Sequence, residues 1–130
     1  MTAPLATPAE ELLSLALANG LAPLTLAGRQ LLPVVQGGMG VGISGGGLAG
    51  SVAALGGIGT IASVDLRRLH PDLMERTQHL EGPEAKAQID AANLQALDRE
   101  VRRARERSQG RGLLAVNVMR AVGEYAHYVT

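Results

Sequence analysis

Cysteine, phenylalanine and tryptophan are absent from this chain of 130 residues, and its aromatic side chains are limited to Tyr125 and Tyr128. Without cysteine, the chain can contain neither a disulfide nor a thiolate metal site, and it has no cysteine nucleophile. Two tyrosines cannot supply the stacking platforms on which single-stranded nucleic acid binds. The 12 basic and 12 acidic residues cancel, so no net charge attracts nucleic acid or anionic lipid. The core must therefore be aliphatic.

Charged residues are missing from residues 30–64, a run long enough to span a bilayer. Glycines interrupt the run repeatedly between Gly37 and Gly50, and each costs a helix about 1 kcal/mol relative to alanine. Buried parallel strands joined by glycine loops explain such a run better than a transmembrane helix does. At the N-terminus, Glu10 and Glu11 precede the apolar stretch, which is the wrong order for a secretory signal. We therefore expect a cytoplasmic protein.

Apolar patterning predicts alternating strands and helices along the chain. Short apolar runs predict three buried strands, at residues 31–36, 58–64 and 113–119. Helical spacing predicts helices at residues 8–19 and 48–55, and glycine follows each of them. Strands that alternate with helices in this way indicate an α/β fold with a parallel sheet built from βα units.

The segment 65–111 is charged and helical, unlike the sequence on either side of it, and Pro71 and Gly82 mark breaks within it. In its second half, alanines and leucines recur at three- and four-residue steps, so we expect one packed and one solvated face. We interpret the segment as a helical connection between the second and third strands. Residues 24–30 are interpreted as a turn-rich lead into the first strand, and residues 122–130 as the first turns of another helix.

Arginines are concentrated near the end of the charged segment, at positions 99, 102, 103, 105, 107 and 111. They could form a basic stripe for nucleic acid or for a partner protein. Asp98, Glu100 and Glu106 lie among them, however, and acids four residues away from an arginine pair with it along a helix. We therefore expect a solvated helix face and no nucleic-acid binding.

The glycine-rich stretch satisfies two short motifs. Residues 40–45 and 45–50 both fit G-x-G-x-x-G, in which glycines let a dinucleotide pyrophosphate approach a helix N-terminus, and Asp65 could then accept a ribose hydroxyl. In a dinucleotide-binding unit the first glycine follows the strand almost directly. Here Gly40 lies several residues beyond the predicted strand, which ends at Gln36. Residues 42–46 also fit the nucleophile elbow G-x-S-x-G.

For the serine of that elbow, Ser44, we favour a helix N-cap or a loop hydroxyl, because it too lies several residues beyond the strand. The acid and histidine that would follow it, Asp65 and His70, are too close together in the sequence to serve reliably as triad partners. The simplest interpretation of the glycines is a tight connection in which backbone and helix pack closely.

Three motifs in a fixed order carry a more specific signal. They are LPVVQGGMG at residues 32–40, LAGSVAALGGIGTI at residues 48–61 and GLLAVNVM at residues 112–119. Together they resemble the opening of the nitronate monooxygenase family, formerly called 2-nitropropane dioxygenases. The resemblance covers roughly residues 31–64 and 112–130, and the long charged connection resembles that of the longer bacterial branch.

The resemblance implies an FMN-binding TIM (β/α)8 barrel, a fold of about 250 residues. We therefore expect residues 1–130 to be the N-terminal portion of one such domain, with about three of the eight strands. The complete enzyme would oxidise small alkyl nitronates with oxygen to a carbonyl compound and nitrite. A flavin enoyl-acyl-carrier-protein reductase shares this opening and remains an alternative. A non-catalytic fragment or interaction module remains another.

The resemblance also implies which residues contact the flavin. The family lays the loop after its first strand along the isoalloxazine ring, and the asparagine of its third strand reaches the flavin. In this chain the corresponding residues are Gln36, Gly37, Gly38, Met39 and Asn117. The residue types suit these roles, because glycine permits close approach to a flat ring and methionine offers a soft apolar contact. For Asn117 a buried amide satisfied by backbone is the alternative.

The catalytic histidine and the phosphate-binding glycines of that family are expected beyond Thr130. The histidines at positions 70, 79 and 127 are expected on the surface, and no two of them have convincing metal-ligand spacing. We therefore expect no metal site, and we expect residues 1–130 on their own to be inactive. The oligomeric state and the physiological substrate stay open.

Overall fold

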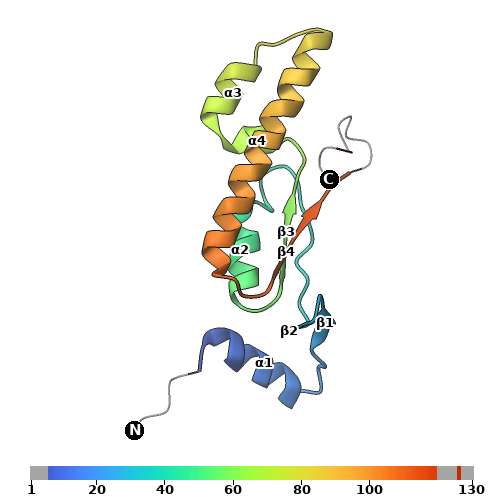
Figure 1. Cartoon of the computed structure of the whole chain (residues 1–130), viewed down its shortest axis with the longest axis vertical. Helices are drawn as coiled ribbons and strands as arrows, with labels where there is room; N and C mark the ends of the chain where they lie inside the picture. Colours follow the sequence, from blue (N-terminus) through green and yellow to red (C-terminus); the bar gives the residue numbers. More distant parts are fainter. Residues whose placement is uncertain (1–5, 120–125, 127–130) are drawn as a thin grey trace.

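The structure, a computed structural model, describes residues 6–119 and Ala126. In this part of the chain four α-helices, one 3₁₀ helix and two small sheets form a mixed α/β fold without a closed barrel (Figure 1). The expected helix at residues 122–130 lies outside the described residues, apart from Ala126. In chain order the elements are α1 (Pro8–Ala18), β1 (Leu24–Leu26), β2 (Arg29–Leu31), α2 (Gly46–Ala54), β3 (Ile58–Ala62), η1 (Leu66–Leu69), α3 (Pro71–Thr77), α4 (Pro83–Ser108) and β4 (Leu113–Asn117).

The parallel sheet that the sequence predicts is present. Strands β3 and β4 pair in parallel, in a register that runs from Ile58 opposite Leu113 to Ala62 opposite Asn117. Val35 forms a parallel bridge to Ile58 on the other edge of β3. Three parallel segments therefore lie side by side in chain order, with their carboxyl ends together.

The first predicted strand, residues 31–36, is wrong in its extent. Leu31 belongs to β2, and only the bridge at Val35 remains parallel to β3. Pro33 lacks the N–H that a longer ladder would need. Nor is the segment buried, since 48% of Val34 and 61% of Val35 are exposed. The segment keeps its direction and its neighbour but is not a buried strand.

The turn-rich lead at residues 24–30 forms an antiparallel hairpin, which the sequence interpretation missed. Strands β1 and β2 pair from Leu24 opposite Leu31 to Leu26 opposite Arg29. The turn residues Ala27 and Gly28 have φ values of 50° and 70°, as a two-residue hairpin turn requires. Alanine at the first of these positions is unusual, and this hid the signal. The hairpin and α1 lie at the amino ends of β3 and β4 (Figure 1).

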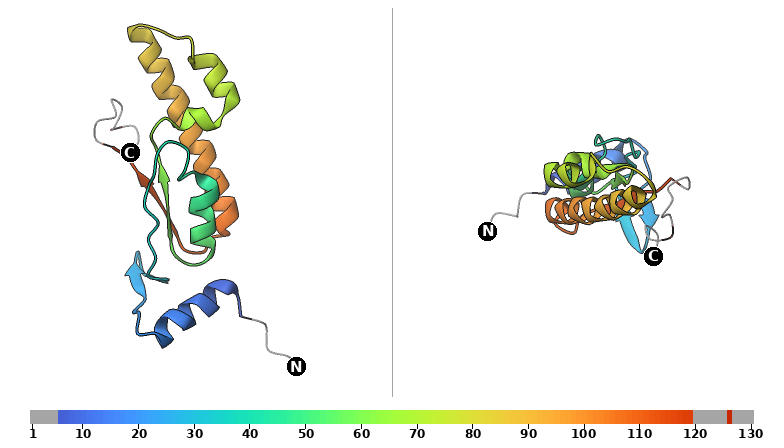
Figure 2. Two further views of the ribbon diagram at one scale, coloured as in Figure 1. Left: turned by 180° about the vertical axis from the view of Figure 1, so that it is seen from behind. Right: turned by 90° about the horizontal axis from the view of Figure 1, so that it is seen from above.

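Helix α2 packs on β3 and against α4, as the views in Figures 1 and 2 show. The glycines of α2 set this close approach. A Cβ on Gly46 would lie 2.2 Å from the carbonyl oxygen of Glu100, and one on Gly50 would lie 2.9 Å from that of Ala104. The expected close packing of backbone and helix is thereby confirmed. The buried cluster around this contact is Ala49, Ile61, Leu66, Leu73, Ala92, Ala96 and Ala104.

The charge-free run at residues 30–64 is divided among several elements: part of the hairpin, a loop, α2 and β3. It therefore forms no continuous helix. No helix in the described ranges has both the length and the apolar character needed to cross a membrane.

The charged segment forms the helical connection between β3 and β4 that the sequence predicts. Its helices α3 and α4 begin at Pro71 and Pro83, where proline suits the first helical turn. Helix α4 ends at Ser108 and is followed by Gln109 and Gly110, both of which have positive φ. Helix α3 folds back along the first part of α4 (Figure 1).

An ion pair joins α3 to α4 and gives a pH-dependent prediction. Both guanidinium Nη atoms of Arg99 donate to the carboxylate of Asp72 at 2.8 Å. This hydrogen bonding lowers the pKa of Asp72 from its ordinary 3.8 to about 2. A depressed carboxyl pKa means that the pair contributes its stability above pH 3.8 and loses it as the pH falls toward about 2.

We expect Arg99→Gln to return the pKa of Asp72 toward 3.8, because the charged hydrogen bonds are removed. An NMR titration of the Asp72 carboxyl carbon measures this directly. Arg102→Gln is the matched control, since Arg102 pairs with Asp98 on the same helix at 2.9 Å. The prediction fails if Asp72 titrates alike in both variants.

Candidate functional site

The residues that the sequence assigns to a cofactor gather at the carboxyl ends of the parallel segments. Asn117 is the last residue of β4, and the loop at residues 36–45 begins where the first segment leaves β3. The Asn117 side-chain Nδ2 lies 3.5 Å from the carbonyl oxygen of Gly38, at the outer limit of a hydrogen bond. The structure thus brings Asn117 to the loop across the end of β3, although the two are 79 residues apart.

Gln36 holds this loop in place. Its side-chain Oε1 accepts from the backbone N–H of Thr60 at 2.9 Å, and its Nε2 donates to the Ser44 hydroxyl at 2.8 Å and to the Gly37 carbonyl. Both the oxygen and the nitrogen of this carboxamide therefore bind groups of the chain itself. Of the five predicted cofactor residues, Gln36 is a positioning residue rather than a free contact.

Ser44 is a buried hydroxyl at the centre of the loop. It is fully buried, accepts from the backbone N–H of Met39 at 2.8 Å and donates to the Gly37 carbonyl at 3.1 Å. A nucleophile elbow needs an exposed hydroxyl, so that interpretation is wrong. The N-cap interpretation is wrong too, because Gly45 is the N-cap of α2. The loop-hydroxyl interpretation is confirmed.

The glycines of the loop differ in whether the packing around them leaves room for a side chain. A Cβ on Gly38 would lie 2.7 Å from the Asn117 Cβ, and one on Gly40 would lie 2.2 Å from a methyl group of Val64. The packing of this chain therefore requires glycine at both positions. Gly37 is different, because a Cβ there would meet nothing within 4 Å and its φ is not positive. Neither packing nor backbone conformation within the described residues explains Gly37.

The surface around Gly37 is open and largely apolar. Met39 is 52% exposed, and Asn117 is exposed as well. The backbone N–H groups of Gly37 and Gly38 donate to no other group in the part of the chain that the structure describes. A cleft of about 60 Å³ adjoins this surface and is lined by Gly38, Gly40, Ala62, Ser63, Val64, Asn117 and Met119. Because Asn117 is exposed, the alternative of a buried amide is wrong.

A buried carboxylate occupies the N-terminus of α2, where a dinucleotide phosphate would bind. Glu100 of α4 is 2% exposed, and its Oε2 accepts from the Gly46 N–H at 2.5 Å. Asp65, the residue expected on a ribose, instead pairs with Arg67 at 3.0 Å and with Arg68. Both anchors of the dinucleotide interpretation are thus already engaged, and the structure does not support it.

Glu100 is one of the residues that the sequence analysis placed wrongly. It was expected among the arginines on the solvated face, yet it points into the contact with α2. Its neighbours confirm the solvated face otherwise: Asp98 pairs with Arg102, and most of the arginines are exposed. The missed signal is the four-residue spacing of Ala96, Glu100 and Ala104, which puts the glutamate in the apolar stripe.

The histidines are placed differently from one another. His79 is exposed, as expected, and His127 lies outside the described residues. His70 is not on the surface: its side chain is 16% exposed, and its Nε2 lies 3.3 Å from Glu100 Oε1. Within residues 6–119 and Ala126, no group of three histidine, aspartate or glutamate residues is placed to hold a metal ion.

The geometry therefore offers one candidate surface, formed by Gly37, Gly38, Met39 and Asn117 and held in position by Gln36 and Ser44. It can present two backbone N–H donors, one carboxamide and an apolar thioether to a flat ligand. Comparison of the chain with known protein families, with curated proteins and with solved structures gives no match.

Proposed function

We propose that this chain is the N-terminal portion of an FMN-binding (β/α)8 barrel of the nitronate monooxygenase type. Three adjacent parallel segments in chain order, joined by helical connections, are how such a barrel begins. The catalytic base and the phosphate-binding residues are proposed to lie outside residues 1–130. The complete protein would oxidise alkyl nitronates with oxygen to a carbonyl compound and nitrite.

The observation that carries the proposal is Gly37. It is a glycine that this chain does not need for its own packing, and it lies beside two unused backbone N–H donors and the exposed Met39. Glycine at such a position allows a ligand to lie directly against the backbone. A flat aromatic ring with hydrogen-bond acceptors along one edge fits that surface.

The residues present fit one side of a flavin ring. Met39 offers apolar contact to the ring face, while the N–H groups of Gly37 and Gly38 and the Asn117 carboxamide can bind its polar edge. The adjoining cleft of about 60 Å³ is too small to enclose a flavin, so these residues supply one wall of a larger site. Bound FMN would supply the redox chemistry, and this wall would orient the ring and shield it from water.

The proposal predicts that the native full-length protein is yellow. We expect flavin absorbance between 350 and 500 nm after purification, and release of nitrite when an alkyl nitronate is added in air. Gly37→Val should weaken FMN binding by about tenfold or more, because the valine side chain would occupy the space of the ring. A tenfold loss of affinity corresponds to about 1.4 kcal/mol. The measurement is the flavin content per chain and the Kd for added FMN.

Ile43→Ala is the matched control, because Ile43 is an exposed apolar residue of the same loop that is not assigned to the flavin. It should keep its flavin. A colourless native protein that releases no nitrite would reject the enzyme and favour the non-catalytic module. A yellow protein that releases no nitrite but reduces an enoyl thioester with a nicotinamide would be the enoyl reductase instead.

A further inference from the structure

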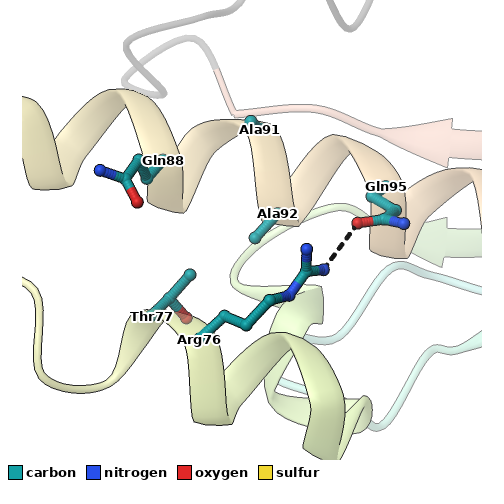
Figure 3. A pocket seen from close by; sticks show the side chains of 6 residues that line it. All are labelled: Arg76, Thr77, Gln88, Ala91, Ala92 and Gln95. Carbon is teal, nitrogen blue, oxygen red and sulfur yellow. Dashed lines mark hydrogen bonds between the residues drawn. The ribbon is translucent and has the colours of Figure 1, made fainter.

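A hollow of about 240 Å³ lies between α3 and α4, within the charged connection (Figure 3). It shares no residue with the candidate flavin surface. Its lining consists of Arg76, Thr77, Gln88, Ala91, Ala92 and Gln95. The proposed flavin chemistry uses none of these residues, so any ligand of the hollow would be a separate one.

The spacing of residues along α4 creates the hollow. Gln88, Ala92 and Gln95 follow steps of four and three, so they lie along one side of the helix. Ala92 between the two glutamines is short, and in Figure 3 its side chain points toward α3. A longer aliphatic residue there would fill the space. The result is an apolar floor with a polar group at each end.

Arg76 is held at one end of this hollow, and part of its guanidinium has no hydrogen-bond partner among the described residues. Its Nη2 donates to Gln95 Oε1 at 3.0 Å, and its Nε donates to the Asp72 carbonyl at 3.3 Å. Figure 3 shows the guanidinium reaching from α3 toward Gln95. Among the described residues, the third nitrogen, Nη1, has no hydrogen-bond partner, and neither has the carboxamide of Gln88.

The charge of the lining favours an anion. Arg76 is the one charged residue among the six that line the hollow. The nearby carboxylate of Asp72 does not cancel it, because both of its oxygens already bind Arg99 at 2.8 Å. The unpaired Nη1 of Arg76 can donate to a carboxylate, a group whose planar geometry suits a guanidinium.

We propose that this hollow binds a small organic monocarboxylate. Its carboxylate would lie on Arg76, and its short carbon chain would lie against Ala92 and extend toward Gln88. One cation calls for one negative charge, and an alanine floor favours a carbon chain over the fully polar surface of a phosphate. The volume is below that of sites for drug-sized ligands, which restricts the ligand to a few carbon atoms.

The test uses propionate as the probe, with NMR chemical shifts of the Arg76, Gln88 and Gln95 side chains followed in the full chain. We expect saturable shifts with a Kd of about 1 mM, in the range that such a small ligand can reach. Arg76→Gln should weaken binding at least tenfold, and Gln88→Ala should weaken it by a smaller factor. Both residues are exposed, so the variants should fold, and melting temperatures verify this.

Arg102→Gln is the control that removes an exposed arginine of α4 outside the hollow. It should bind propionate as the unmodified chain does. Propionamide, which has the same shape without the charge, should not bind. The proposal is overturned if propionate causes no saturable shift, if Arg76→Gln and Arg102→Gln bind alike, or if inorganic phosphate binds more tightly than propionate.

Discussion

Gly46→Ala is expected to destabilise the fold by about 3 kcal/mol, near the upper end of what overpacking costs. The added methyl carbon would lie 2.2 Å from the carbonyl oxygen of Glu100, which belongs to the backbone of α4 and cannot turn aside. The two helices would have to separate, and the buried cluster between them would loosen. Because small domains have a total stability of only about 5–15 kcal/mol, urea denaturation will show such a loss clearly.

Gly47→Ala is the matched control, one residue further along the same helix. There the new Cβ would meet the Arg103 guanidinium at 3.5 Å, an ordinary contact with a flexible side chain. Alanine in place of glycine favours a helix by about 1 kcal/mol, so this variant should be as stable as the unmodified chain or more so. Equal destabilisation by both substitutions would show that the close contact with the Glu100 carbonyl is not what requires glycine at position 46.

The sequence predicted the elements whose signals are local. Each of these signals lies within a few residues of the element it predicts: the apolar run before Asp65 for β3, and the prolines at positions 71 and 83 for α3 and α4. The three elements lie where these signals predict them. The hairpin at residues 24–31 was missed, because alanine replaces the asparagine or glycine that usually marks its turn. The length of the first strand, residues 31–36, was overestimated. An apolar run does not show whether a neighbouring strand is present on each side of it to complete the hydrogen bonding.

The sequence predicted which residues gather at this edge of the sheet, but it did not predict which of them are held by the chain itself. Gly37, Gly38, Met39 and Asn117 come together as expected, because parallel strands bring their carboxyl ends to one edge. That Gln36 is consumed by Thr60 and Ser44 depends on tertiary contacts, which residue types do not reveal. Nor could the sequence separate glycines required by packing from one that leaves the backbone open.

Glu100→Ala is expected to cost about 3 kcal/mol, and Glu100→Gln a smaller amount. The buried carboxylate accepts from the Gly46 N–H, where the positive end of the α2 dipole strengthens the bond. Alanine leaves that N–H buried without a partner and opens a cavity, whereas glutamine keeps the shape and one acceptor oxygen. Glu106→Gln on the exposed face of α4 should change stability by less than about 0.5 kcal/mol.

Hydrogen exchange of the Gly46 amide separates a local role from a global one. If the carboxylate caps α2, exchange at this amide should accelerate in Glu100→Ala by more than the loss of global stability explains, and it should stay slow in Glu106→Gln. An equally stable Glu100→Gln variant would mean that the desolvation of the carboxylate cancels its bond to Gly46. Helix α2 directly follows the loop that carries Gly37 and Met39. Under the proposed function, a loosened α2 N-terminus should therefore also weaken the binding of FMN, although Glu100 does not touch that surface.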